Sequence, residues 1–362
     1  MKLLYVSHKD ITHPKSGGAE VYADIFLRHV ALAGHKVDII TSRFSNQDAF
    51  EDRGNIRIFR YRGYFGPHLA LPVFLIFGKY DLIITDLGHV VPWPSTVFYG
   101  DKTISIFYHL HRRTLQGQVS KFGRVILSLL EYIYPFLNKK CFFVTISSTS
   151  RNDLVSLGIN SKKICIIPPG VDVVSFVPGQ KSSHPKMIFF SGLRDYKRPE
   201  LALDVLRTLV NKYPDFQLLI AGDGPAKERL KERTAKYGLQ SNVHFLGRID
   251  RTTLIRYVSE SSVNVQFSVS EGFGITIIEA SACGTPTVAF RVPGVVDAIV
   301  DSVNGFLVED GDLQAFTDRV EYISRDPYQW VGKCLEVANR FSSEQEGKSW
   351  LDLLENVTER TP

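Results

Sequence analysis

Short apolar runs alternate with amphipathic segments along most of the chain. In the first half, β-rich runs occur at 2–8, 36–42, 56–62, 81–86, 103–110 and 142–147, and helix-like segments such as 19–34 and 123–137 lie between several of them. The runs are apolar throughout, which is typical of strands buried on both faces of a parallel sheet. The sequence therefore predicts an α/β architecture in which helices wrap parallel sheets.

The alternation stops at residues 166–185, which are rich in Pro, Gly and Ser and indicate a linker. It resumes with strand-like runs at 186–192, 216–222, 242–247, 263–268, 285–290 and 305–308, and with helical segments such as 199–213. A chain of 362 residues suits two cores better than one. We therefore expect two doubly wound Rossmann-like domains, 1–178 and 179–340, whose parallel sheets face an interdomain cleft.

Residues 341–362 form a terminal segment in which Ser343 and Glu346 have the spacing of a capping box, which predicts a helix. The chain opens without the pattern of a signal peptide, and its most apolar region, 64–86, is interrupted by Pro67, Pro72 and Lys79. Scattered cysteines without a CxxC motif indicate reduced core thiols and favour a cytoplasmic protein; they are Cys141, Cys165, Cys283 and Cys334.

The net charge of +5 is unevenly distributed along the chain. Residues 1–178 contain 21 Lys and Arg against 13 Asp and Glu, a balance of +8, which leaves −3 for the rest. Such a basic half indicates a phosphate-bearing partner, an anionic membrane surface or nucleic acid, or simply a solvated basic surface. The run 120–140 is compatible with a helix on an anionic membrane and equally with a core-facing helix of the first domain.

Ligands of open parallel sheets bind at the carboxyl ends of the strands, so the residues after each strand are the candidate site. After the first strand, Gly17 and Gly18 precede an amphipathic helix whose N-terminus can receive an anion. Their spacing lacks the G-x-G-x-x-G fingerprint, which argues against a nicotinamide enzyme. After the run 103–110, a second cluster contains His109, His111 and Arg112.

In the second domain, Arg194, Lys197 and Arg198 follow the first strand and can neutralise a diphosphate. Gly222 belongs to a tight turn after the next strand. Arg248 and Ile249 follow the third strand, where the backbone can meet a base.

The stretch "SEGFGITIIEASACGTP" follows a fourth strand and combines a glycine-rich loop with a helix. Glu271 precedes the helix, and Glu279 lies about one turn into it. Carboxylates accept hydrogen bonds from vicinal hydroxyls, and a free helix N-terminus meets phosphate, so a nucleotide-sugar fits the combination. The loop residues expected at this ligand are Gly272, Phe273, Gly274 and Ile275.

The segment "EGFGITIIEASACGTPTVAF" resembles the E-x7-E signature of retaining glycosyltransferases of family 4, which have the GT-B fold. Other segments resemble the same family in the same order, among them "SGGAEVYADIFLRHVALAGHKVDIIT", "AGDGP", "FLGRID" and "FSSEQEGKSWLDLL". The resemblance implies a hexosyltransferase-like enzyme with donor binding in the second domain, acceptor binding in the first, and a terminal helix that crosses back to the first domain.

Residue by residue, the resemblance implies that Glu279 holds the nucleotide ribose and that Glu271 lies beside the donor sugar. Lys197 matches the family's diphosphate lysine, and the family arginine falls at Gly192, with Arg194 as the candidate replacement. His109 matches the histidine near the donor sugar, with His111 as its rival.

The resemblance further implies a retained anomeric configuration, and we expect front-side displacement without metal or cofactor. The "DGD" at 310–312 resembles a metal-binding D-x-D, although we interpret it as a turn. The expected co-substrate is a UDP- or GDP-sugar, and the expected acceptor is a carbohydrate or lipid-linked molecule in polysaccharide, glycolipid or glycoconjugate synthesis.

The expected location is the cytoplasm, with peripheral contact at the inner membrane face as a hypothesis. A nucleotide-sugar-binding protein without transferase activity and a GT-B epimerase remain alternatives, whereas nucleic-acid binding is disfavoured.

Overall fold

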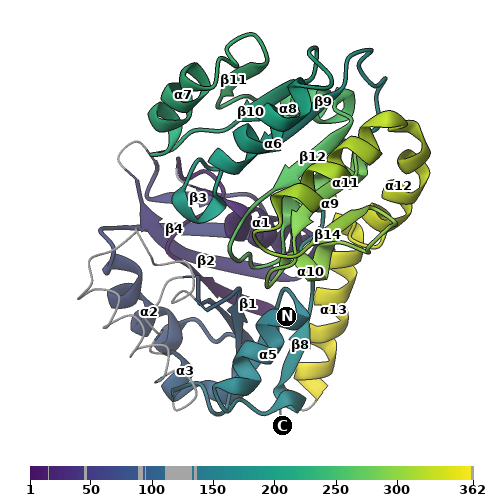
Figure 1. The fold of residues 1–362 in the computed structure, drawn as a ribbon. Helices are drawn as coiled ribbons and strands as arrows, with labels where there is room; N and C mark the ends of the chain where they lie inside the picture. The colour runs from purple at the N-terminus through teal and green to yellow at the C-terminus, as the bar shows by residue number, and fades with distance from the viewer. Residues whose placement is uncertain are drawn as a thin grey trace. The chain divides into compact units, whose positions relative to one another are not determined.

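The computed structural model describes residues 1–14, 16–44, 47–88, 93, 95–110, 133 and 137–359. The chain divides into two compact units (Figure 1), a first unit of Met1–Gly170 with Ser343–Pro362 and a second unit of Val171–Ser342. The division falls inside the segment 166–185 that the sequence marks as a linker, earlier than the boundary expected at 178. The helix expected at 123–137 lies outside the described residues except for Ile133 and Leu137.

The first unit is built on a sheet with the strand order β3-β4-β2-β1-β5-β6-β7-β8. All of its described strand pairs are parallel except β3 with β4. Its strands are β1 (Lys2–Val6), β2 (Lys36–Arg43), β3 (Phe50–Asp52), β4 (Ile56–Arg62), β5 (Leu82–Asp86), β6 (Thr103–Phe107), β7 (Phe142–Thr145) and β8 (Ile164–Ile166). Its helices are α1 (Gly18–Leu32), α2 (Gly66–Phe77), α3 (Ser95–Phe98), α5 (Ser148–Ser156) and α13 (Ser343–Glu359), with short 3-10 helices at Gly100–Lys102 and Ser161–Lys163.

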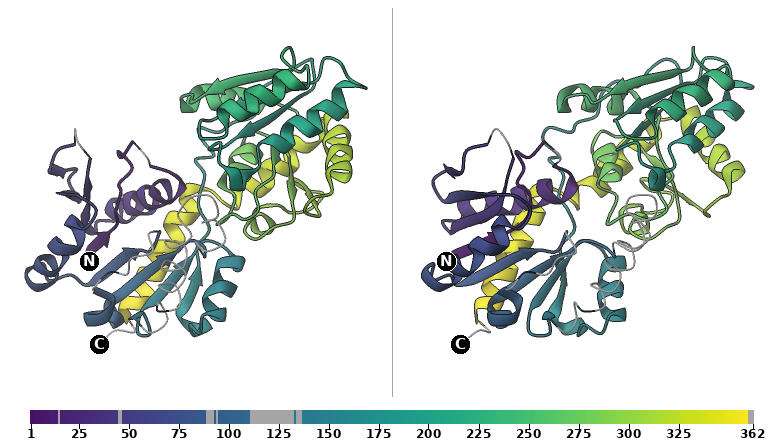
Figure 2. Two further views of the ribbon diagram at one scale, coloured as in Figure 1. Left: turned by 60° about the vertical axis from the view of Figure 1, so that its left-hand side comes forward. Right: turned by 90° about the vertical axis from the view of Figure 1, so that its left-hand side faces the viewer.

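The terminal helix α13 packs against α1 (Figure 2) and completes the core of the first unit. Trp350 is fully buried, its ring stacks on Phe26 at 4.1 Å between centroids, and its Nε1–H donates to the Tyr22 hydroxyl at 3.0 Å. Glu346 does not close the capping box that the sequence predicts at this helix. Its buried carboxylate instead accepts the backbone N–H of Gly170 at 2.6 Å, and burial raises its pKa well above the ordinary value.

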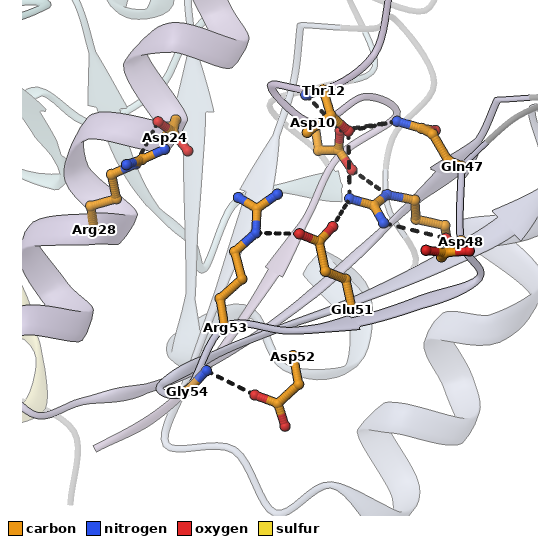
Figure 3. Close-up of polar contacts among 11 residues, drawn as sticks. Asp10, Thr12, Asp24, Arg28, Gln47, Asp48, Glu51, Asp52, Arg53 and Gly54 are labelled. Atoms are coloured by element: carbon orange, nitrogen blue, oxygen red, sulfur yellow. Dashed lines mark hydrogen bonds and ion pairs between the residues drawn. The ribbon is translucent and has the colours of Figure 1, made fainter.

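The connection between β2 and β4 forms the short antiparallel strand β3, and a groove of about 380 Å³ lies beside it. Alternate residues of β4 face opposite sides of the sheet: Ile56 and Ile58 line the groove together with α1, whereas Phe59 contacts Phe74 of α2. Near the groove, the buried Arg60 pairs with Asp10 at 2.6 Å and with Glu51 at 2.7 Å, and Figure 3 shows how these carboxylates gather. This network ties the loop after β1 to β3.

The second unit has an all-parallel sheet with the order β11-β10-β9-β12-β13-β14. Its strands are β9 (Lys186–Phe190), β10 (Gln217–Ala221), β11 (Val243–Gly247), β12 (Val263–Gln266), β13 (Thr287–Phe290) and β14 (Gly305–Val308). Its helices are α6 (Glu200–Val210), α7 (Lys227–Lys236), α8 (Arg251–Glu260), α9 (Ile275–Ala282), α10 (Val295–Ala298), α11 (Leu313–Arg325) and α12 (Val331–Asn339), with 3-10 helices at Asp195–Lys197 and Tyr328–Trp330. Phe267 and Phe316 stack in its core at 4.4 Å.

Each strand-like run that the sequence indicates contains a strand of the structure, so the predicted α/β architecture is confirmed. The sequence pattern missed β3, β8 and α2. The helix α2 was missed because Pro67 and Pro72 interrupt its run: Pro67 occupies the first turn, where a missing N–H costs nothing, and Pro72 is accommodated inside the helix.

Candidate functional site

The carboxyl edge of the second sheet gathers most of the predicted donor residues, and Glu271 is at its centre. This residue lies in the loop between β12 and α9, and its carboxylate oxygen Oε1 is in contact with Lys197 Nζ. The same oxygen accepts the hydroxyl of Ser268 at 2.5 Å and the amide of Gln266 at 3.1 Å. Three donors therefore fix one oxygen of a nearly buried carboxylate. Gln266 and Ser268 were not singled out from the sequence, although they belong to the same strand and loop.

The loop that carries Glu271 has a shape that requires glycine. Gly294 has φ of +81°, and a Cβ there would lie 2.1 Å from the carbonyl oxygen of Glu271. Gly274 has φ of +87° and is the residue from which α9 begins, so the left-handed conformation sets the direction of that helix. The loop residue Phe273 is buried against Phe341 at 5.2 Å, while Gly272 and Ile275 are partly exposed. Phe273 therefore anchors the loop, while Gly272 and Ile275 remain accessible.

Glu279 has a different environment from Glu271. It lies on α9, is partly exposed, and makes no side-chain hydrogen bond or ion pair with any residue that the structure describes. The protein atoms packed around it disfavour the charged carboxylate and raise its pKa to about 7, with Arg251 the only opposing influence. That arginine is itself paired with Asp172 at 3.6 Å. Glu279 is thus an accessible acceptor that the described protein leaves unsatisfied.

The three basic residues of the cluster after β9 have different surroundings. Lys197 is held by Glu271 as described above. Arg194 is exposed, and its Nε lies 3.8 Å from where a Cβ of Gly192 would be, so its side chain folds back over the glycine. Arg198, which the sequence also suggested for a phosphate, donates to the carbonyl of Phe267 at 2.6 Å, pairs with Asp310 at 2.7 Å and packs over Phe290.

The remaining predicted donor residues lie on the neighbouring strand ends. Gly222 has φ of +140°, and a Cβ there would lie 2.0 Å from the carbonyl oxygen of Ser191, so this turn supports the loop after β9. Arg248 and Ile249 follow β11, where Arg248 is exposed and Ile249 is partly exposed. These two residues are therefore accessible at the same edge of the sheet.

The Asp310–Asp312 turn is occupied by structural contacts. Asp310 pairs with Arg198, and Asp312 accepts the backbone N–H of Ala315 at 2.9 Å, which caps α11. This fits the interpretation of "DGD" as a turn. Throughout the described residues, no group of three or more His, Cys, Asp or Glu side chains is placed to hold a metal ion.

In the first unit, the Gly17–Gly18 loop leads directly into α1, which begins at Gly18. The backbone N–H of Gly17 already donates to the carboxylate of Glu20 at 2.6 Å, and Glu20 also pairs with Lys9 at 2.8 Å. A Cβ at Gly18 would meet nothing within 4 Å. The positive end of α1 is therefore partly neutralised by the chain itself, while Gly18 stays open to a close approach.

His109 lies just after β6, at the carboxyl edge of the first sheet, and is partly exposed. His111 and Arg112 lie outside the described residues. Nothing in the sequence pattern singles out Asp86, which ends β5 nearby and is buried. It accepts the hydroxyls of Tyr5 at 3.1 Å and Tyr108 at 3.3 Å, and burial raises its pKa to about 6.

Two family models match adjoining parts of the chain. The model described as Glycosyltransferase Family 4 matches residues 16–174, and the model described as Glycosyl transferases group 1 matches residues 173–346. The chain belongs to the GT-B glycosyltransferases. The fold assignment agrees with a solved structure: sucrose-phosphate synthase from Thermosynechococcus elongatus has a TM-score of 0.83 at 20% identity, covering 99% of this glycosyltransferase and all of that chain.

Two curated relatives are similar over most of this glycosyltransferase. One is a component of the phosphatidylinositol N-acetylglucosaminyltransferase of Arabidopsis thaliana, which is 26% identical over 320 residues, or 84% of this chain and 70% of the relative. The other is D-inositol 3-phosphate glycosyltransferase of Corynebacterium diphtheriae, which is 25% identical over 357 residues, or 86% of this chain and 82% of the relative.

Proposed function

We propose that this glycosyltransferase is a retaining enzyme of family 4 that moves a sugar from a nucleotide-diphospho-sugar to an acceptor hydroxyl. The observation that carries the proposal is the contrast between two glutamates at one strand end. Glu271 is fixed by three donors, whereas Glu279 is accessible and unsatisfied. A carboxylate without partners suits ribose hydroxyls, which supply two donors at once. A carboxylate held rigidly suits the positioning of a reacting sugar.

In this proposal the second unit binds the donor. Lys197 exchanges part of its contact with Glu271 for the diphosphate, and Arg194 adds a second positive charge from its position over Gly192. Gly272, Gly274 and Ile275 bring the loop backbone and the N-terminus of α9 toward the phosphates. The backbone at Arg248 and Ile249 receives the base.

The proposed reaction is a front-side displacement in which the leaving diphosphate helps to remove the acceptor proton. The bond from the anomeric carbon to the diphosphate oxygen breaks, and the acceptor oxygen forms the new bond on the same face. Lys197 and Arg194 stabilise the charge that develops on the leaving oxygen, and His109 positions the donor sugar. We propose that the reaction needs no metal, and activity that is lost in EDTA and restored by Mn²⁺ would overturn this point.

The two curated relatives described above are named for transfer to phosphatidylinositol and to D-inositol 3-phosphate. These names favour an inositol phosphate, free or as a lipid headgroup, as the first acceptor to test. A UDP-sugar and a GDP-sugar are the first donors to test.

The test begins with thermal unfolding in UDP-, GDP-, ADP- and dTDP-sugars, because ligands that bind the folded state raise its melting temperature. The donor found in this way is then incubated with and without acceptors while nucleoside diphosphate release is measured. Acceptor-dependent release with retained anomeric configuration supports the proposal. Inverted product, or binding of no nucleotide-sugar, refutes it.

One observation favours a second candidate function. Gly192 occupies the position of the family arginine, and the exposed side chain of Arg194 makes no hydrogen bond or ion pair with the described residues. A weakened phosphate clamp fits a nucleotide-sugar-binding protein without transfer. Donor binding with no turnover for any acceptor supports this candidate, and Gly192→Arg then becomes the informative variant, because φ at this glycine does not lie in the left-handed region.

A further inference from the structure

The helix α2 presents an apolar stripe on its outer side. Leu69, Val73, Ile76 and Phe77 are exposed by 79%, 55%, 68% and 76%, and Phe65 just before the helix is exposed by 60%. Their spacing of three or four residues places them along one side of the helix. We call these five residues the α2 stripe. Large side chains clustered in this way mark an interaction surface, whereas single exposed apolar residues are ordinary.

The opposite side of α2 packs against other residues of the first unit. Pro67, Ala70 and Leu71 are buried, and Phe74 meets Phe59 of β4 at 5.0 Å between ring centroids. An amphipathic surface helix would place charged residues on its outer side, but no residue from Gly66 to Phe77 is charged. The helix is therefore apolar on both sides and packed on only one of them by described residues.

The N-terminal end of α2 is fixed to the carboxyl edge of the first sheet by a stack of rings. His8, which follows β1, stacks on Tyr64 with centroids 4.3 Å apart. His68 of α2 stacks on the buried Trp93 at 4.1 Å, and the Trp93 Nε1–H donates to the carbonyl of Asp86 at the end of β5 at 2.8 Å. The N-terminal end of the α2 stripe is thereby held next to the carboxyl ends of β1 and β5.

Charge at the two ends of the stripe indicates the chemistry of the partner. Arg62 precedes α2, Lys79 follows it, and both are exposed. The exposed acidic residue nearest in sequence, Asp81, already accepts the backbone N–H of Lys2 at 2.7 Å. An uncharged apolar stripe with aromatic residues and basic ends fits the interface of an anionic bilayer. There, the apolar side chains would bury their surface among the acyl chains, and the basic side chains would pair with lipid phosphates.

We propose that the α2 stripe docks the first unit on an anionic membrane surface, with the helix lying in the interface. In the described residues, no helix is long and apolar enough to cross a membrane, so the stripe would lie on the bilayer rather than span it. This inference deepens the proposed function, on which it rests, because it places a lipid-linked acceptor beside the carboxyl edge of the first sheet. The run 120–140, the other candidate for membrane contact, lies outside the described residues apart from Ile133 and 137–140.

The test is flotation of the full chain with vesicles of phosphatidylcholine, with and without phosphatidylglycerol. We expect the protein to float with the anionic vesicles, and Leu69→Glu with Ile76→Glu to weaken binding by about tenfold or more, because two apolar side chains no longer enter the interface. Arg62→Gln with Lys79→Gln should remove most of the preference for the anionic lipid. The matched control is Leu32→Glu with Val174→Glu, which changes two residues exposed by 86% and 84% away from α2 and should bind as the wild type does.

Light scattering on the same samples distinguishes the membrane from a second copy of the chain. A wild-type dimer that the Leu69 and Ile76 substitutions convert to a monomer, without vesicle binding, overturns the proposal. Equal flotation of the wild type and the double glutamate variant also overturns it. Since flotation needs neither donor nor acceptor, its outcome is independent of turnover. The nucleotide-sugar thermal shift, measured on each variant, shows whether the second unit is intact.

Discussion

Glu279→Gln should stabilise the protein at alkaline pH while it weakens nucleotide binding. The protein atoms packed around the carboxyl group of Glu279 raise its pKa from the ordinary value of 4.5 to about 7. The folded state therefore holds a proton that the unfolded state releases, so this residue's contribution to the free energy of unfolding is present below about pH 4.5 and is lost as the pH rises toward 7. The difference between a pKa of 4.5 and one of about 7 corresponds to at most about 3 kcal/mol of unfolding free energy at pH 8. Glutamine is uncharged at every pH, so Glu279→Gln should recover this unfolding free energy.

The assay is urea unfolding at pH 5 and pH 8 for the wild type, Glu279→Gln and the control Glu309→Gln. Glu309 is exposed and pairs with Arg291, so neutralising it should change stability by less than about 1 kcal/mol at either pH. Glu279→Gln should gain up to about 3 kcal/mol at pH 8 and much less at pH 5.

Nucleotide affinity, unlike stability, should fall in Glu279→Gln. Hydrogen bonds from ribose hydroxyls to a charged carboxylate are worth about 1.5–3 kcal/mol, so Glu279→Gln should weaken the nucleotide about 10- to 100-fold at pH 8. Wild-type affinity should fall as the pH is lowered through 7, whereas affinity of the variant should not. Equal stability changes at both pH values, or unchanged nucleotide affinity, would refute this account of Glu279.

Three further substitutions test other parts of the structure. Glu271→Ala should lower turnover by about 100-fold or more while the nucleotide thermal shift is retained, and intact turnover would contradict its proposed role. Gly294→Ala should destabilise the second unit by at least about 2 kcal/mol in urea unfolding, because the new Cβ would clash with the carbonyl oxygen of Glu271. The control is Gly311→Ala: its φ is also positive but no atom lies near the new Cβ, so it measures the free-energy cost of the left-handed backbone conformation alone. Trp350→Ala should cost about 3–5 kcal/mol, since it removes the ring stacked on Phe26, and a loss under about 1 kcal/mol would show that α13 is dispensable for the first unit.

The fold was predictable because short apolar runs at regular intervals indicate strands buried on both faces. The segment 81–86 illustrates this, since β5 occupies Leu82–Asp86 and is buried at every position. The short strand β3 could not be found this way, because Phe50, Glu51 and Asp52 have no apolar pattern and are ordered by pairing with β4. The helix α2 escaped detection because its apolar residues have no polar alternation and Pro72 argues locally against a helix.

The candidate site was predictable as a set of strand ends, but not in the roles of its members. Arg194, Lys197 and Arg198 are basic residues close together in sequence. Only the structure shows that the guanidinium of Arg198 donates to a backbone carbonyl and pairs with Asp310. Glu346 has the spacing of a capping box, but tertiary packing directs its carboxylate to Gly170. Spacing in sequence reports local geometry, whereas these contacts join residues that are distant along the chain.

The discontinuous make-up of the first unit has a consequence for synthesis on the ribosome. Residues Val171–Ser342 form the second unit from a single continuous stretch, so it can fold as soon as that stretch has emerged. The first unit must wait for Ser343–Pro362, because Tyr22 and Phe26 lack their Trp350 partner until then. The part of the protein that is made first is therefore completed last, and during that interval its α1 face is the surface that a chaperone would recognise.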